Sequence, residues 1–211
     1  MDGKGGEKGA TMSWVKNLLK LAGAYFGYAL CVSTLFHALP KAVSEGSQEA
    51  LGKELSDFID KQGEKKEKIV LVEDMVQAFN LRIHLLRRAQ STIDVVCHAV
   101  QQGKSTDAFM GELIKAADRG VSVRILLDGK AGAMSREAKD MLSALNGHEN
   151  ISYARYNPIR FGRPWEWHTL LHDKFILVDE SYLLLGGRNL GDRFFRPAGY
   201  EGKLVDDWEA L

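Results

Sequence analysis

Residues 72–157 alternate between helix-type and strand-type segments, and this order restricts the fold more than any other feature of the sequence. The helical segments carry apolar residues at spacings of three and four, whereas the strand segments are short and rich in β-branched residues. In chain order, helix first, the segments are 72–90, 92–100, 107–119, 121–128, 135–145 and 151–157. The alternation predicts α/β layering with right-handed crossovers.

Two more strands are expected after the alternating part of the chain. Residues 174–178 and 182–185 are apolar, and a turn at 179–181 connects them. A connection this short joins antiparallel strands rather than parallel ones. The predicted fold class is therefore α/β, with a mixed β-sheet flanked by helices, over residues 69–211.

The N-terminal part contains one long uncharged segment. Residues 21–39 include no Asp, Glu, Lys or Arg, and at about 1.5 Å per residue such a helix spans most of a bilayer core of roughly 30 Å. We therefore predict a single transmembrane helix in the cell membrane; a buried core helix and a cleaved signal peptide are the alternatives. Because Lys16 and Lys20 precede the segment, residues 1–20 are expected in the cytoplasm and the folded domain outside.

The other N-terminal segments are polar. Residues 1–11 are rich in glycine and charge and are expected to be disordered, and residues 42–68 are expected to form a linker with a short amphipathic helix. The chain has 28 basic and 28 acidic residues, so its overall charge does not indicate a nucleic-acid partner. Cys31 and Cys97 suggest neither a disulfide nor a metal site.

The residues that indicate chemistry begin at His172. Residues two apart on a strand share a face, so His172 and Lys174 are expected to project together. A neutral imidazole acts as nucleophile or proton donor near neutral pH, and a neighbouring lysine stabilises negative charge on a phosphate. Gly186 and Gly187 are expected to let a phosphate approach backbone N–H groups, and Asn189 offers an amide donor. The alternative interpretation is an exposed strand start followed by an ordinary turn.

Several carboxylates accompany this histidine. Asp179 completes the spacing His-x-Lys-x4-Asp but lies an odd number of residues from His172, so we expect a turn or hydrogen-bonding role for it rather than that of a base. Asp192 and Glu201 are both candidates to orient His172. His168 lies four residues before His172, a spacing that on a helix could bind zinc, but no third ligand is evident. We therefore predict no metal site, and we predict no cofactor.

Other residues receive simpler interpretations. His98 is expected to be a hydrogen-bonded core histidine, although strand ends in open sheets often border the site. Trp165 and Trp167 either pack in the fold or form a lipid-facing lip at the mouth of the site. Residues 128–130 end a strand without phosphate-loop spacing, so no nucleotide site is predicted there.

The stretch from His172 to Asn189 resembles the HKD motif of the phospholipase D superfamily, in which His-x-Lys-x4-Asp is followed after six residues by Gly-Gly or Gly-Ser, with Asn soon after. The matching residues are His172, Lys174, Asp179, Gly186, Gly187 and Asn189. The family often has serine where this chain has Gly187. The run GGRNLGDRFF and upstream stretches such as AADRGVSVRILLDG are most similar to the cardiolipin synthase branch, and the resemblance covers about residues 70–205.

The resemblance implies a metal-independent, two-step displacement at a phosphodiester. It implies that His172 attacks phosphorus to form a phosphohistidine, while Lys174 and Asn189 hold the phosphate. The histidine of a second HKD motif protonates the leaving alcohol. A phosphatidylglycerol-like lipid is the implied donor, and a second lipid alcohol is the implied acceptor.

The chain departs from the family pattern because it contains only one His-x-Lys-x4-Asp and stops at Leu211. We expect it to be the first half of such an enzyme, which needs a second HKD half; pairing of two copies in a homodimer is the alternative. Two other functions remain open: a hydrolase or nuclease of the same superfamily, and a truncated membrane protein without activity. Neutral net charge and the membrane helix argue against nucleic acid as the substrate.

Overall fold

A computed structural model describes residues 5–38, 68–131 and 136–211 of the chain. These residues belong to two compact units. The first contains the N-terminal helix and the loop 159–169, and the second contains residues 64–158 and 170–211. The linker predicted at 42–68 lies outside the described residues, apart from Lys68.

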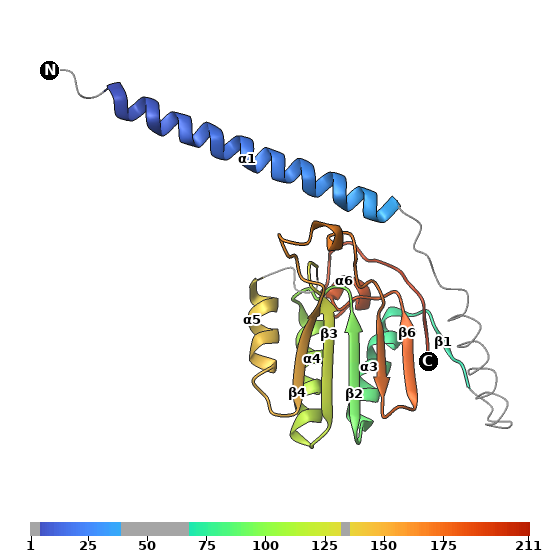
Figure 1. The fold of residues 1–211 in the computed structure, drawn as a ribbon. Coiled ribbons are helices and arrows are strands. Elements are labelled where there is room, and N and C mark those ends of the chain that lie inside the picture. The colour runs from blue at the N-terminus through green and yellow to red at the C-terminus, as the bar shows by residue number, and fades with distance from the viewer. Residues whose placement is uncertain (1–4, 39–67, 132–135) are drawn as a thin grey trace, which may run out of the picture. The chain divides into compact units, whose positions relative to one another are not determined.

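Helix α1 (Gly5–Ala38) belongs to the N-terminal unit and is continuous (Figure 1). Within it, Ser13–Leu35 is apolar and long enough to cross a membrane. The predicted apolar helix is therefore present, but it begins earlier than residue 21. Residues 5–11 are helical rather than disordered, because the chain has no proline before Pro40 and glycine only weakens a helix that is already propagating.

The second unit is built on a seven-stranded sheet, with strand order β1-β7-β6-β5-β2-β3-β4. The parallel part consists of β2 (Thr92–Cys97), β3 (Ser122–Asp128) and β4 (Ile151–Tyr156). The antiparallel part consists of β5 (Phe175–Val178), β6 (Tyr182–Gly186), β7 (Glu209–Ala210) and β1 (Leu71–Val72). The predicted mixed sheet and the β5–β6 hairpin are confirmed.

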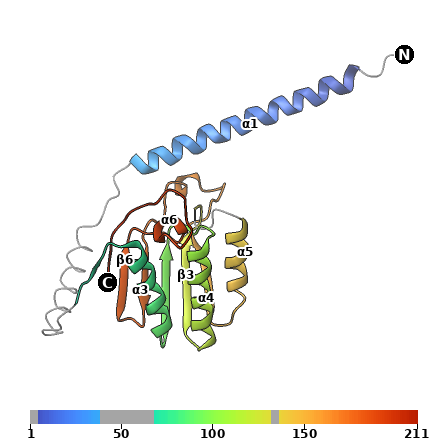
Figure 2. The same ribbon diagram turned by 180° about the vertical axis from the view of Figure 1, so that it is seen from behind.

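Helices cover one face of this sheet. Figures 1 and 2 show α3 (Met75–Arg88), α4 (Lys104–Asp118) and α5 (Arg136–Leu145) on the same side of the strands, while the short α6 (Asp192–Phe195) follows the hairpin. Alternate strand residues point into the core beneath the helices. Buried residues that form this core include Val95, Ile125, Leu127, Ile176, Leu86, Phe109 and Leu113.

The direction of β5 decides where the histidine motif lies. Because β5 runs antiparallel to β2, with Phe175 opposite Val96, the start of β5 lies beside the end of β2. Strand β3 is parallel to β2 and ends at the same edge. The residues just before β5 and just after β2 therefore meet at the carboxyl edge of the parallel strands, where open α/β sheets bind ligands.

Candidate active site

Two histidines lie side by side at this edge. The imidazole rings of His172 and His98 have centroids 4.9 Å apart and are tilted by 57°. His172 is exposed and His98 is half-buried. His98 Nδ1 lies 2.9 Å from the carbonyl oxygen of Leu171, so Nδ1 carries the proton and donates it. The hydrogen bond expected of His98 is present, and its ring lies at the strand end that borders the site, beside His172.

The backbone of Leu171, the residue before His172, is held at both its carbonyl and its N–H. While His98 binds the carbonyl of Leu171, the carboxylate of Asp128 accepts a hydrogen bond from its N–H at 2.9 Å. Asp128 also accepts from the N–H groups of Lys130 and Ala131, both at 2.8 Å. Burial alone raises the pKa of Asp128, but these three amides outweigh it and hold the pKa below its usual value.

Lys174 is a buried cation beneath His172. Its Nζ donates to the carbonyl oxygen of His172. Burial lowers the pKa of Lys174, and the nearby Asp207 opposes that shift. The charge of Lys174 is the main reason that the pKa of His172 lies below its usual value, with burial and His98 adding to the effect. The His172 ring is therefore mostly neutral at pH 7, which is the state required of a nucleophile.

Asn189 has a fixed orientation. Its Oδ1 accepts from the N–H of Ala99 at 3.0 Å and from the Cys97 thiol at 3.5 Å. Burial raises the pKa of Cys97, which keeps the thiol protonated as a donor. Because Oδ1 faces the end of β2, the Nδ2 group of Asn189 points away from these partners.

Gly186 and Gly187 are glycines for a different reason from the one expected. Their N–H groups already donate to the carbonyls of Lys174 and Trp208, at 3.1 and 3.2 Å, so the expected open backbone donors are absent here. A Cβ on Gly187 would overlap the carboxylate of Asp207, and one on Gly186 would overlap Glu209 and its neighbour. The pair lets the segment before β7 pack closely against the end of β6.

Asp207 is a carboxylate that the sequence analysis missed. It lies against Gly187, and its charge partly offsets the lowering of the Lys174 pKa by burial. It is half-buried, and its Oδ1 accepts from the N–H of Trp208 at 2.8 Å. No motif marks it, because it comes from the segment before a strand of only two residues.

The carboxylates singled out from the sequence have other roles. Asp179 lies at the far end of β5 from His172 and accepts from the N–H groups of residues 90–92 at 2.7–3.0 Å, which fits the expected hydrogen-bonding role. Asp192 accepts from the N–H groups of Lys104 and Ser105 at the start of α4, at 3.1 and 2.8 Å. Glu201 is exposed and makes no ion pair within the described part of the chain.

A buried ionic cluster supports the floor of the site. Glu209 on β7 pairs with Arg82 of α3 and with Arg188, whose Nη1 lies 3.5 Å away. Arg188 also donates to the carbonyls of Val72 and Glu73. All three charged side chains are buried, and both arginines line a small cavity together with Lys174. This cluster fixes β1 and β7 against the rest of the sheet.

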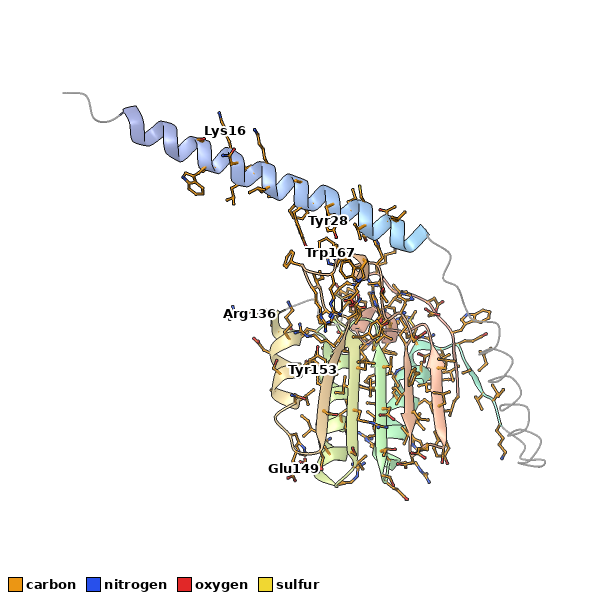
Figure 3. All side chains as sticks on the ribbon, in the orientation of Figure 1. Lys16, Tyr28, Arg136, Glu149, Tyr153 and Trp167 are labelled. Carbon is orange, nitrogen blue, oxygen red and sulfur yellow. The ribbon has the colours of Figure 1, made fainter. Side chains whose placement is uncertain are left out.

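The loop 159–169 belongs to the other compact unit. Its short 3-10 helix η1 (Pro164–Glu166) precedes Trp167, whose indole N–H donates to the carbonyl of Arg160 at 2.9 Å. Figure 3 shows Trp167 among the side chains of this segment. Among the residues with described side chains, no group of three or more His, Cys, Asp or Glu is arranged to hold a metal ion.

Several known proteins are similar to this chain in sequence or in fold. A family model described as "Cardiolipin synthase, PLD-like domain" matches residues 82–205, more than half of the chain. Cardiolipin synthase C of Escherichia coli (strain K12) is 34% identical over 144 residues, which cover 64% of this chain and 30% of that protein. The chain thus spans less than a third of the length of this relative.

Solved structures share the fold. NucT from Helicobacter pylori superposes with a TM-score of 0.53 at 14% identity, over 68% of this chain and 83% of that one. The phospholipase D family member Nuc from Salmonella typhimurium gives a TM-score of 0.50 at 17% identity, over 68% and 82%. At these identities the likeness concerns the fold of the α/β unit.

Proposed function

Because this chain belongs to the family of cardiolipin synthase PLD-like domains, we propose that it is a phosphatidyltransferase of the phospholipase D type, with His172 as its nucleophile. The donor would be a phosphatidylglycerol-like lipid, and the acceptor an alcohol of a second lipid. The apolar helix α1 would anchor the chain in the cell membrane as a single span, with the α/β unit outside.

The observation that carries this proposal is the grouping of His172, Lys174 and Asn189 at one edge of the sheet. The charge of Lys174 lowers the pKa of His172, so the ring has a lone pair available at neutral pH. The same charge attracts a phosphate, and the Nδ2 group of Asn189 is oriented to donate to one of its oxygens. Asp179, at the other end of β5, would act on the fold rather than on the substrate.

The proposed reaction has two displacements. In the first, a ring nitrogen of His172 attacks phosphorus, an N–P bond forms, and the P–O bond to the leaving alcohol breaks as that alcohol takes a proton from a second histidine. In the second, the acceptor alcohol gives its proton to that second histidine while its oxygen attacks phosphorus and the N–P bond breaks. We propose that the second histidine comes from a further HKD half or from another copy of this chain.

An activated substrate tests the role of His172 without the second histidine. p-Nitrophenol ionises near neutral pH, so a p-nitrophenyl ester of a short-chain phosphatidic acid needs no acid to expel its leaving group. The full chain in neutral detergent should release a burst of p-nitrophenolate as the phosphohistidine forms. The burst should disappear in His172→Ala and persist in His84→Ala, which removes an exposed histidine of α3.

The same preparations distinguish the competing functions. Phosphatidylglycerol and single-stranded DNA are supplied separately, and lipid products and DNA fragments are measured. Transfer or hydrolysis of the lipid that depends on His172 supports the proposal. A burst that survives in His172→Ala, or cleavage of DNA alone, would contradict it.

A further inference from the structure

A second polar cavity lies at the same edge of the sheet, between β4 and α5. Its volume is about 360 Å³, which lies within the range of small-molecule sites. The side chains that form it are Asp128, Lys130, Lys139, Ser143, Tyr153 and Arg155. Figure 3 labels Tyr153, which lies between β4 and α5. We call this space the β4–α5 cavity.

The cavity has an excess of positive charge. Lys130, Lys139 and Arg155 face a single carboxylate, that of Asp128. Asp128 is the single acidic side chain in this lining, so the cationic side chains outnumber it. Within residues 68–131 and 136–211, neither Lys139 nor Arg155 forms an ion pair.

Hydroxyl groups complete the lining. Tyr153 is half-buried, and burial raises the pKa of its phenol, so the group remains a hydrogen-bond donor across the physiological range. Ser143 of α5 adds a second hydroxyl. Cationic side chains together with hydroxyl donors match a group with several anionic oxygens, and phosphate is such a group.

We propose that the β4–α5 cavity binds the phosphate group of an anionic ligand, either a phospholipid headgroup or free phosphate. It is separate from the phosphate position expected beside His172, and binding there requires no chemistry at that histidine. The proposal therefore does not rest on the proposed function.

Asp128 connects the cavity to the candidate active site. It accepts from the N–H of Lys130 at the cavity and from the N–H of Leu171, the residue before His172. A ligand that shifts Lys130 therefore also shifts Asp128, whose carboxylate holds the N–H of Leu171 next to His172. Occupancy should be visible at both amides.

The test is a titration of the full ¹⁵N-labelled chain in neutral detergent at constant ionic strength. Inorganic phosphate and dihexanoylphosphatidylglycerol are added separately, and the amide shifts of Lys130 and Leu171 are followed. The double variant Lys139→Gln/Arg155→Gln is compared with Arg88→Gln/Arg136→Gln, which removes two exposed cations outside the cavity. The titration is repeated in His172→Ala, in which binding should be retained.

We expect saturable shifts at both amides. The affinity should fall about tenfold or more in the cavity variant, because its charge-assisted hydrogen bonds to the phosphate are lost, and it should change less than about twofold in the control. Tighter binding of the lipid identifies a headgroup site, and binding of inorganic phosphate alone identifies a free-phosphate site. Absence of saturable shifts with both probes, or an equal loss of affinity in the control, overturns the proposal.

Discussion

His98 follows β2 and His172 precedes β5, yet their rings lie 4.9 Å apart at the carboxyl edge of the sheet. The charge of Lys174 is the largest cause of the lowered pKa of His172, and the neighbouring His98 lowers it further. The pair therefore supplies a neutral ring at the position where a nucleophile is needed.

The first prediction concerns the pKa of His172, measured by NMR titration of its ring protons. Lys174→Met should raise this pKa, because the charge of Lys174 is the largest cause of its depression. His98→Gln retains a donor for Leu171 but removes the imidazole, which is a smaller cause of the depression, so it should raise the pKa of His172 by a smaller amount. A larger rise in His98→Gln than in Lys174→Met would reverse the order of causes that we infer.

The pH dependence of activity follows from the same shift. Attack requires neutral His172, whose folded-state pKa lies below its ordinary value of about 6.5. In a plot of kcat/KM, or of the p-nitrophenolate burst, against pH, the midpoint of the acid limb should therefore lie below pH 6.5. It should move upward in His98→Gln, and an unchanged limb would show that another group controls it.

A further prediction concerns Asp128. In Asp128→Asn the amide oxygen can still accept from Lys130 and Ala131, but the amide nitrogen cannot accept from Leu171. We expect a loss of about 1–3 kcal/mol in the free energy of unfolding, measured with urea. The pKa of Asp128 is lower in the folded state than in the unfolded state. The contribution of Asp128 to the free energy of unfolding is therefore full above the unfolded pKa of about 3.9, and it is lost as pH falls through the folded pKa. Asp118→Asn, at an exposed carboxylate of α4, is the matched control.

Glu209→Ala should be among the most destabilising substitutions. It leaves Arg82 and Arg188 buried without their carboxylate, and removing one member of a buried ionic group costs about 3–5 kcal/mol. Glu201→Ala, at an exposed carboxylate, should change the free energy of unfolding by less than about 0.5 kcal/mol. Equal effects of the two substitutions would show that the buried cluster adds nothing.

Gly187 and Asp207 can be tested as a pair. Gly187→Ala should destabilise the fold by about 1–3 kcal/mol, because the new Cβ overlaps the Asp207 carboxylate. In the background of Asp207→Ala the same substitution should cost much less. Denaturant unfolding of the unmodified chain, the two single variants and the double variant gives the coupling energy between Gly187 and Asp207. Additive effects would mean that the overlap is relieved elsewhere.

Much of the fold could be predicted because its signals are local. The apolar periodicity of 72–90 marks α3, the β-branched residues of 92–100 mark β2, and the short turn after Val178 identifies an antiparallel hairpin. Residues 5–11 were predicted to be disordered from their composition, which carries no information about the helix that continues beyond them.

The rest depends on contacts between distant segments. His98 reaches His172 only because β5 inserts beside β2, and no spacing in the sequence encodes that pairing. Strand β7 has two residues, too few for a periodic pattern, so Asp207 and Glu209 carried no signal. The glycine pair was correctly singled out, but its packing against the segment before β7 could be seen only in three dimensions.

The four-residue length of β5 makes this part of the chain intolerant of insertions. Lys174 is buried on the helix-covered side, and the next residue, Phe175, belongs to the opposite side with Val96 and Leu126. A single residue inserted between Phe175 and Ile176 would exchange these sides, moving Phe175 to the helix-covered side and Lys174 to the open surface. Natural length variation in relatives should therefore spare β5 and fall in the loop that precedes it.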